Sequence, residues 1–319
     1  MSQGTGLALA TLLLAPAVVA NEKPKSLYPK VVPACLEILV GGRLDGSGAI
    51  VSEKGLIMTA CHVIRKKSNR YEALSPTIGR RSLKLICTDR SNDLALLSLP
   101  SKEEKYPFLK VSRNIPPEGK PCYLLGSPIF RHNLLLTGHV ARRKVGFEWY
   151  DDGFAGTFAI AGIGAGGTSG GPWLNAKGEI IGVQVASMTL GEAHQGVASA
   201  IPPQAILALM ESRKTVVAPP MQAAVEEIWG QSPEFLEKLK ANTRGLVLRQ
   251  VAKGGLAAKA GLKDEEIILK AGKDKIYERI EPFIKMLRSK KPGDSLKLVV
   301  GDSYVDRKRE VTVKLAGLK

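Results

Sequence analysis

The sequence predicts a mainly β protein built from two domains, and three observations lead to this fold class. The chain has 319 residues, which is enough for about two domains. Between residues 31 and 200, short apolar runs alternate with glycine, proline, aspartate and asparagine, a pattern typical of many short strands in a sandwich or barrel. The stretch 215–220 ends in a double proline, and the remainder mixes helix and strand patterns. We therefore expect a β domain over residues 21–214, a linker over 215–220 and a small α+β domain over 221–319.

The first domain is expected to consist of short strands followed by one closing helix. We expect strands at residues 36–40, 55–59, 83–87, 94–97, 122–125 and 180–185. Glu37 is the one polar residue within the first of these runs. Residues 202–214 have a helical pattern, because a proline stands at the start, Ile206 and Met210 lie on one apolar face, and Arg213-Lys214 suit the C-terminus.

The second domain is expected to alternate strands and helices. Ser232-Pro233-Glu234 predicts the start of a short helix, with a capping serine, a proline at the first helical position and an acid in the first turn. A longer helix is expected at 280–289, where Ile280, Phe283, Ile284 and Leu287 share one face. The other expected elements are strands at 245–251, 265–270, 295–300 and 310–315 and a helix at 256–260.

The net charge of the chain is +16, from 46 basic and 30 acidic residues. Such an excess points to a polyanionic partner when it is concentrated on one surface. Here the basic residues are spread over both predicted domains, and aromatic residues, 5% of the chain, do not interleave with them as a base-stacking platform requires. We expect no specific nucleic-acid partner, and at most weak contact with a polyanion or a membrane surface.

The N-terminus has the pattern of a signal peptide over residues 1–20. Residues 6–20 carry no charge and end in Val18-Val19-Ala20, which is too short to span a bilayer but suits a signal core with a small residue at the cleavage point. No Lys or Arg precedes this run, so the sequence leaves open the alternative that the segment is retained as a short anchor. The pattern predicts a secreted or periplasmic protein.

The four cysteines, Cys35, Cys61, Cys87 and Cys122, all lie in the first 122 residues. They form no CxxC pair and no Cys/His spacing that suits zinc, and we expect neither a metal ion nor another cofactor. An oxidising compartment would permit one or two disulfides, in any of three pairings. Small buried thiols on strands are the alternative that the sequence leaves open.

The segment Gly-Gly-Thr-Ser-Gly-Gly-Pro, from Gly166 to Pro172, is the strongest chemical signal. A serine hydroxyl becomes a useful nucleophile when a base takes its proton, and the oxyanion that forms needs donors already in place. Glycines around Ser169 let backbone N–H groups point into one small concavity. We expect Ser169 to be the nucleophile and the N–H groups of Gly167 and Ser169 to bind the oxyanion.

Two further motifs supply the remaining catalytic groups. His62, one of four histidines, follows an apolar run in Thr-Ala-Cys-His-Val, and Asp93 leads directly into another in Asn-Asp-Leu-Ala-Leu-Leu. An acid at the start of an apolar run is unusual unless it is buried with a partner. We expect His62 to be the general base and Asp93 the acid that orients it, with Asp89 as the nearest rival.

In the order His, Asp, Ser, these motifs resemble the HtrA (Deg) family of trypsin-like serine proteases, which have the chymotrypsin-like double β-barrel. The resemblance covers residues 31–214 and includes the segments Gly-Glu-Ile-Ile-Gly-Val and Ala-Ser-Ala-Ile-Pro after the serine. Thr168 departs from the family by replacing an asparagine, and Cys61 replaces a small residue. The resemblance also places Ile163 at the base of the specificity pocket, which implies a preference for small or medium apolar side chains.

The second domain resembles a PDZ domain over Thr243–Val251, Gly255–Leu262, Glu265–Gly272 and Lys291–Ser295. Such domains bind an extended C-terminus by strand addition. The loop that would hold the carboxylate lies near residues 222–228, which contain no glycine and include Glu226-Glu227. This departure favours a structural role for the domain, or one in positioning a trimer.

Together, the resemblances imply a serine endopeptidase that cleaves unfolded or misfolded proteins outside the cytoplasm through an acyl-enzyme. Its partners would be unfolded protein or peptide substrates. The family resemblance also implies a homo-oligomer, a trimer. Two other classes remain open from sequence. In the first, the protease fold acts as a chaperone or scaffold without turnover, because the three residues are not assembled into a site. In the second, the protein is a polyanion-binding module, an alternative that only the net positive charge supports.

Overall fold

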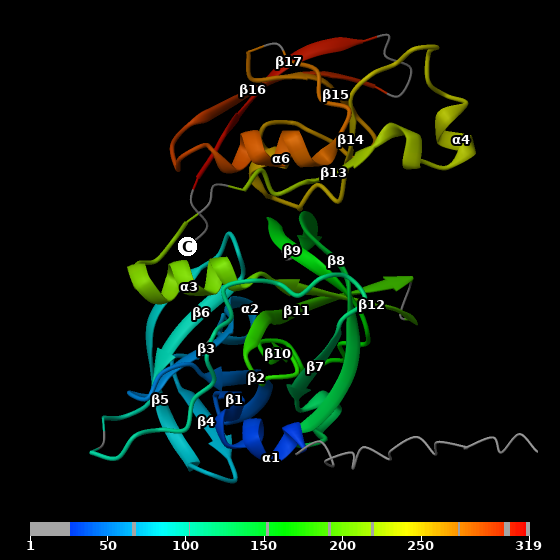
Figure 1. Cartoon of the computed structure of the whole chain (residues 1–319). Coiled ribbons are helices and arrows are strands. Elements are labelled where there is room, and N and C mark those ends of the chain that lie inside the picture. Colours follow the sequence, from blue (N-terminus) through cyan, green and yellow to red (C-terminus); the bar gives the residue numbers. More distant parts are fainter. Residues whose placement is uncertain are drawn as a thin grey trace, which may run out of the picture.

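The computed structural model describes residues 26–316, apart from 66–67, 102, 151–152, 191–192, 218–219, 274 and 303–306. It consists of two closed six-stranded barrels followed by one five-stranded sheet. Figure 1 shows the barrels packed side by side, with the C-terminal sheet stacked over one end of them. The predicted fold class, a mainly β double barrel followed by a small α+β unit, is confirmed. The predicted signal peptide lies outside the described residues.

The first barrel has the strand order β1-β2-β3-β6-β5-β4 and closes where β1 pairs with β4. Strands β3 and β6 carry apolar residues on both faces, and both faces are buried in the protein core. Ile57, Met58 and Leu96 are among the fully buried side chains of these strands. Its strands are β1 (Cys35–Val40), β2 (Arg43–Ile50), β3 (Leu56–Ala60), β4 (Tyr71–Ser75), β5 (Gly79–Asp89) and β6 (Leu94–Ser98).

The second barrel has the order β10-β11-β12-β9-β8-β7. Trp173, Phe158 and Ile160 fill its centre, and the Trp173 indole donates a 2.7 Å hydrogen bond to Gln184. Its strands are β7 (Pro121–Gly126), β8 (Leu134–Tyr150), β9 (Gly153–Ala161), β10 (Pro172–Leu174), β11 (Ile180–Leu190) and β12 (Ala193–Ile201).

Short helices connect and close the barrels. Helix α3 follows Pro202 as expected and ends where Arg213 adopts a left-handed conformation; it packs Ile206 and Leu209 against β6 and β11, one strand from each barrel. The helical segments of this region are α1 (Leu27–Val31), η1 (Val32–Ala34), α2 (Cys61–Ile64), η2 (Pro128–Phe130) and α3 (Pro203–Ser212). Among the described residues, no helix is long and apolar enough to cross a membrane.

The C-terminal sheet runs β13-β14-β15-β16-β17, with all neighbours antiparallel. Helix α6 covers it with Phe283, Ile284 and Leu287, the apolar face predicted from the sequence. The strands are β13 (Ala224–Glu227), β14 (Leu246–Arg249), β15 (Ile267–Ala271), β16 (Ser295–Gly301) and β17 (Lys308–Lys314). The helices are η3 (Ile228–Gly230), α4 (Pro233–Leu236), α5 (Leu256–Lys259) and α6 (Ile280–Arg288).

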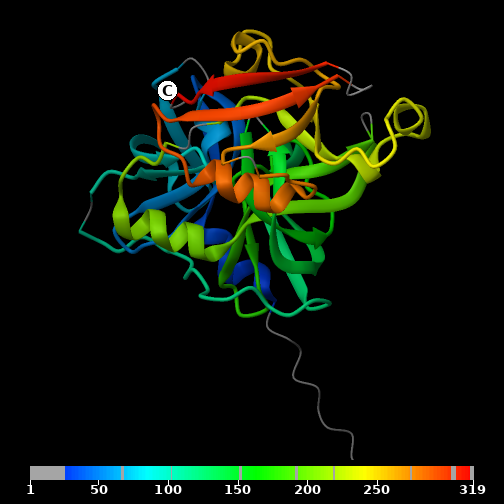
Figure 2. The ribbon, with the colours of Figure 1, turned by 90° about the horizontal axis from the view of Figure 1, so that it is seen from above.

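Residues beyond the barrels contact them through apolar packing and through the backbone. Phe147 and Phe154, on the long β8–β9 hairpin, pack against the core of the C-terminal sheet, and α6 lies on the side of that sheet that faces the barrels (Figures 1 and 2). Val216, inside the predicted linker, pairs with the end of β5: its N–H donates to Thr88 O at 2.8 Å, and Arg90 N–H donates to Val216 O at 3.3 Å. Part of the predicted linker is therefore attached to the first barrel.

All four cysteines are buried and none of them is in a disulfide, so the disulfides that the sequence permitted are absent from the structure. Each thiol lies within a barrel wall or next to it, which is the alternative that the sequence left open. Burial raises the pKa of Cys122 to about 12 and also raises the pKa values of Cys35 and Cys87. These thiols stay protonated at neutral pH and act as small apolar residues.

Candidate active site

Helix α2 begins directly after β3 and presents His62 next to Asp93. The ring Nδ1 of His62 lies 2.7 Å from Asp93 Oδ2, and the backbone N–H of His62 donates to Asp93 Oδ1 at 2.9 Å. The N–H of Cys61 donates to the main-chain oxygen of Asp93 at 3.0 Å. Because a carboxylate only accepts hydrogen bonds, this contact assigns the proton to Nδ1 and makes Nε2 the basic nitrogen of the neutral ring.

Asp93 and Asp89 are both buried, but they have different partners. Asp89 closes its own turn by accepting four hydrogen bonds of 2.6–3.1 Å from the N–H and side-chain groups of Ser91 and Asn92. Asp93 follows this turn with a φ of 51°, a left-handed conformation that aims its side chain back at α2. Of the two acids considered from the sequence, the structure brings Asp93 to His62.

Ser169 lies in the loop between β9 and β10, and this loop is seated against the first barrel. Its main-chain oxygen accepts a 2.8 Å hydrogen bond from Ser47 N–H on β2. A Cβ at Gly46 would lie 2.8 Å from Ser169 O and 2.6 Å from Val63, the residue after His62. The glycine thus lets the serine loop approach α2, and it brings the segments of Ser169 and His62 together across the junction of the barrels.

The backbone before Ser169 is fixed at Gly167. This residue has a φ of +98°, and a Cβ there would lie 2.4 Å from Ser127 O, so only glycine fits. Gly166 O accepts from Ile129 N–H and Gly167 O accepts from the Ser47 hydroxyl, each at 2.8 Å. Because a trans peptide points its N–H opposite to its carbonyl, these bonds turn the N–H groups of Gly167 and Thr168 away from Ile129 and Ser47.

Thr168, the departure from the family pattern, completes this turn. Its side chain is buried, and both its hydroxyl and its N–H donate to Ala165 O, at 2.7 and 3.0 Å. The hydroxyl thus closes the loop on itself instead of pointing at a reacting group. Ile163, the expected base of the specificity pocket, lies earlier in the same segment with 55% of its surface exposed.

Sequence reasoning missed a buried hydrogen-bond network that supports the serine loop. The Ser47 hydroxyl, which donates to Gly167 O, also accepts from Ser127 N–H at 3.1 Å. The Ser127 hydroxyl donates to the buried carboxylate of Glu37, which also lies 2.6 Å from His132 Nδ1. The isolated acid in an otherwise apolar strand, Glu37, was the signal that could have revealed this network.

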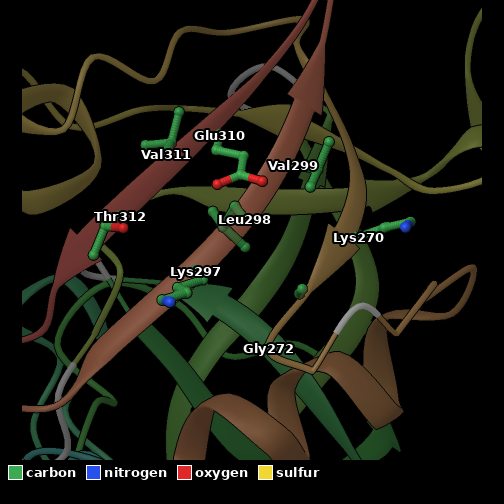
Figure 3. A pocket seen from close by; sticks show the side chains of 9 residues that line it. Lys270, Gly272, Lys297, Leu298, Val299, Glu310, Val311 and Thr312 are labelled. Atoms are coloured by element: carbon green, nitrogen blue, oxygen red, sulfur yellow. The ribbon is translucent and has the colours of Figure 1, made fainter.

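Two further features of the described structure bear on a second site. Among the described residues, no group of three or more His, Cys, Asp and Glu side chains could hold a metal ion. A hollow of about 380 Å³ on the C-terminal sheet is lined by the Lys270, Lys297 and Glu310 side chains (Figure 3). Its lining comes from β15, β16, β17 and Gly272, which follows β15, and includes none of the predicted site residues.

Residues 46–183 match the family model of the trypsin-like peptidase domain. The chain is 29% identical over 326 aligned positions to serine protease HTRA1 of Xenopus tropicalis, covering 94% of this chain and 65% of that protein. It is 30% identical over 233 positions to a probable periplasmic serine endoprotease, DegP-like, of Hahella chejuensis, covering 70% of this chain and 47% of that protein. The chain thus spans about half to two thirds of the length of the curated relatives it matches.

Solved structures share the fold. The HtrA-type protease AlgW with a decapeptide superposes with a TM-score of 0.60 at 20% identity, covering 92% of this chain and 98% of that one. The serine endoprotease from Yersinia pestis superposes with a TM-score of 0.55 at 19% identity, covering 92% and 97%. Because 92% of this chain is covered in each case, the match extends beyond a single domain.

Proposed function

We propose that this chain is an HtrA-type serine endopeptidase with Ser169 as nucleophile, His62 as general base and Asp93 as the orienting acid, because residues 46–183 match the trypsin-like peptidase domain and the proteins similar to the chain are HtrA-type proteases. The observation that carries the proposal is the double contact of Asp93 with His62, through both Nδ1 and the backbone N–H. A carboxylate in this position holds the ring in one tautomer and stabilises the imidazolium that forms when Nε2 takes a proton.

The proposed reaction uses groups of the chain alone. Ser169 Oγ attacks the carbonyl carbon of the substrate while His62 Nε2 accepts the hydroxyl proton, and the N–H groups of Gly167 and Ser169 bind the oxyanion. The imidazolium then gives its proton to the leaving amine, which breaks the C–N bond and leaves an acyl-enzyme. Water, deprotonated by His62, hydrolyses the ester and restores Ser169.

We further propose that the enzyme prefers small or medium apolar side chains on the acyl side of the cleaved bond. The support is Ile163, which brings no carboxylate to pair with Lys or Arg. A pocket of this kind discriminates by about 1–3 kcal/mol per methylene, so cleavage is broad. Mass-spectrometric mapping of cleaved casein should show Val, Ala, Leu and Ile at the cut, and a map dominated by basic residues would reject this preference.

The proposed substrates are unfolded or misfolded proteins outside the cytoplasm. The proposed assembly is a homo-oligomer, and the family resemblance suggests a trimer. The support is the relative that is named periplasmic and the neighbours whose structures are named as complexes with peptides. The test is incubation of the chain and of its Ser169→Ala variant with casein. Cleavage that the variant loses supports the peptidase. Suppressed aggregation without cleavage would favour the alternative, a chaperone or scaffold on a protease fold.

The C-terminal unit is proposed to be a PDZ-like domain that positions the protease instead of reading C-termini. In strand addition, a peptide would lie along the free edge of β13, beside α6. Glu227, the last residue of β13, spans this gap: its carboxylate accepts from Ile280 N–H at 3.0 Å and pairs with Arg279 at 2.8 Å. An incoming carboxylate would meet the negative charges of Glu226 and Glu227, which oppose its binding.

A further inference from the structure

The last residue of α6, Arg288, reaches from the C-terminal domain to the loop that precedes the catalytic acid. Its Nη1 donates to Ser91 O at 2.6 Å and to Phe154 O at 3.0 Å, and its Nη2 donates to the Asn92 side-chain oxygen at 3.0 Å. The guanidinium also lies over the ring of Phe147, 5.6 Å from its centre. One side chain of the second domain thus contacts both the 89–93 loop and the β8–β9 hairpin.

On the loop side, Asn92 is the link between the two domains. Its amide nitrogen donates to Asp89 Oδ2 at 2.6 Å, while its oxygen accepts from Arg288. Arg288 therefore supplies a positive charge close to the buried Asp89 carboxylate. Burial lowers the pKa of the Arg288 guanidinium, and the charge of Asp89 opposes this effect.

Asp93 is the next residue after Asn92, and its left-handed backbone has to be held in place from outside. A non-glycine residue with positive φ is in a sparsely populated conformation, and it persists where its surroundings determine it. Two sets of contacts surround this position. The N–H groups of Cys61 and His62 bind Asp93 from α2, while Arg288 binds Ser91 and Asn92 from the opposite domain.

We propose that Arg288 is a positioning residue for the catalytic acid, so that docking of the C-terminal domain holds Asp93 in the conformation that meets His62. This inference rests on the proposed function of Asp93. Full turnover then requires the docked domain, and loss of the Arg288 contacts lowers kcat while substrate binding is kept, because Arg288 acts through the loop and touches no substrate.

The other polar contacts between the domains provide a matched comparison. Lys144 pairs with Glu281 at 3.3 Å, and the Trp149 indole donates to Gln250 at 2.7 Å. Both lie on the β8–β9 hairpin and neither touches residues 89–93. A variant at Lys144 weakens docking without changing the loop directly, so it separates a general interface effect from a specific effect on Asp93.

The test compares the full-length chain with its Arg288→Ala, Arg288→Lys and Lys144→Ala variants on a short chromogenic peptide. We expect Arg288→Ala to lower kcat by about tenfold with KM within about twofold, which is the size of effect typical of residues that couple two sites. Arg288→Lys should keep part of the activity, because the lysine ammonium group keeps the positive charge but can donate to fewer of the three acceptors than the guanidinium does. Lys144→Ala should stay within about twofold of wild type, as a surface ion pair contributes little.

Hydrogen exchange of the segment 88–97 gives a second readout that does not depend on turnover. In an Ser169→Ala background, Arg288→Ala should accelerate exchange there, while Lys144→Ala should not. If the wild-type chain cleaves no peptide, the proposed function fails, and exchange alone then decides whether Arg288 holds the loop. Equal kcat and equal exchange in the Arg288→Ala and Lys144→Ala proteins would overturn the inference, as would a rise in kcat for Arg288→Ala. If Arg288→Ala does not fold, Arg288→Lys carries the same comparison.

Discussion

The two junctions of this molecule are built in different ways. Between the barrels, backbone groups meet directly: Ser169 O accepts from Ser47 N–H, and glycines remove the side chains that would keep the loops apart. Between the barrels and the C-terminal domain, the polar contacts come from side chains such as Arg288 and Lys144, which are partly or largely exposed to solvent. The first junction is held by backbone groups in close contact, whereas the second depends on side-chain contacts and on the apolar packing of Phe147 and Phe154. We infer that the nucleophile loop is fixed by folding and that the loop of the acid is sensitive to domain docking.

The largest effects are expected at the proposed catalytic residues, whose segments lie at the barrel junction. Ser169→Ala or His62→Ala should lower kcat by about 10⁶-fold, and Asp93→Asn by about 10⁴-fold, as in a comparable triad. Circular dichroism should show intact folding. Asp89→Asn is the control, because Asp89 closes its own turn, and it should cost far less than Asp93→Asn. The reverse order would mean that Asp89 is the catalytic acid.

The next largest effect is expected at Ser47, within the same junction. Ser47→Ala removes the hydroxyl that joins Ser127 N–H to Gly167 O, and a buried group without a partner costs about 1–3 kcal/mol of unfolding free energy. We expect that loss in urea titrations and a fall in kcat of about 10- to 100-fold, less than the 10²–10³ for losing an oxyanion donor.

Ser52→Ala provides the matched control for Ser47, since its hydroxyl accepts from Leu56 N–H within the β2–β3 turn. This variant should lose stability but keep kcat. An equal fall in kcat for both variants would show that Ser47 acts through stability alone.

Removal of residues 221–319 probes the second junction. The truncated chain should still fold, because both barrels and α3 lie before this point, and its thermal melt should remain cooperative. Since Arg288 is lost, peptide turnover should fall about tenfold, as for Arg288→Ala. If the KM for casein rises instead and short peptides are cleaved as before, the domain captures substrates and does not position the acid.

The smallest effect is expected for peptides added to the C-terminal domain. Because Glu227 spans the gap between β13 and α6, calorimetric titration of the full-length Ser169→Ala chain with apolar peptides ending in a free carboxylate should show no specific binding. An amidated peptide is the control. Micromolar binding that disappears on amidation would show that the domain reads C-termini.

The sequence singled out the proposed catalytic residues but not the contacts that surround them. Ser169, His62 and Asp93 stand in local patterns, glycines around a serine and an acid at the start of an apolar strand, that can be recognised without the fold. The hydrogen bond between Ser47 and Gly167 joins residues 120 positions apart in the sequence, and the one between Arg288 and Ser91 joins residues 197 positions apart. No local sequence pattern encodes such pairs.

The β8–β9 hairpin was missed for a related reason. The charges of Arg142-Arg143-Lys144 interrupt the apolar run that marks a buried strand, so the segment has the pattern of a basic surface cluster. In the structure, β8 extends through these residues because its far end packs Phe147 against a separate core. The strand is stabilised by packing against the core of the C-terminal sheet, a tertiary contact that the residue pattern of the strand itself cannot reveal.

The attachment of Val216 to β5 also limits how far the second domain can travel. Met221 is buried in the C-terminal core, so residues 217–220 are all that separates two anchored points of the chain. At about 3.5 Å per residue, this tether spans less than about 20 Å. A partner held so closely is present at an effective concentration in the millimolar range. Docking that would be too weak to detect between separate molecules therefore persists within the chain, and the isolated domain would have to be supplied at about that concentration to replace it.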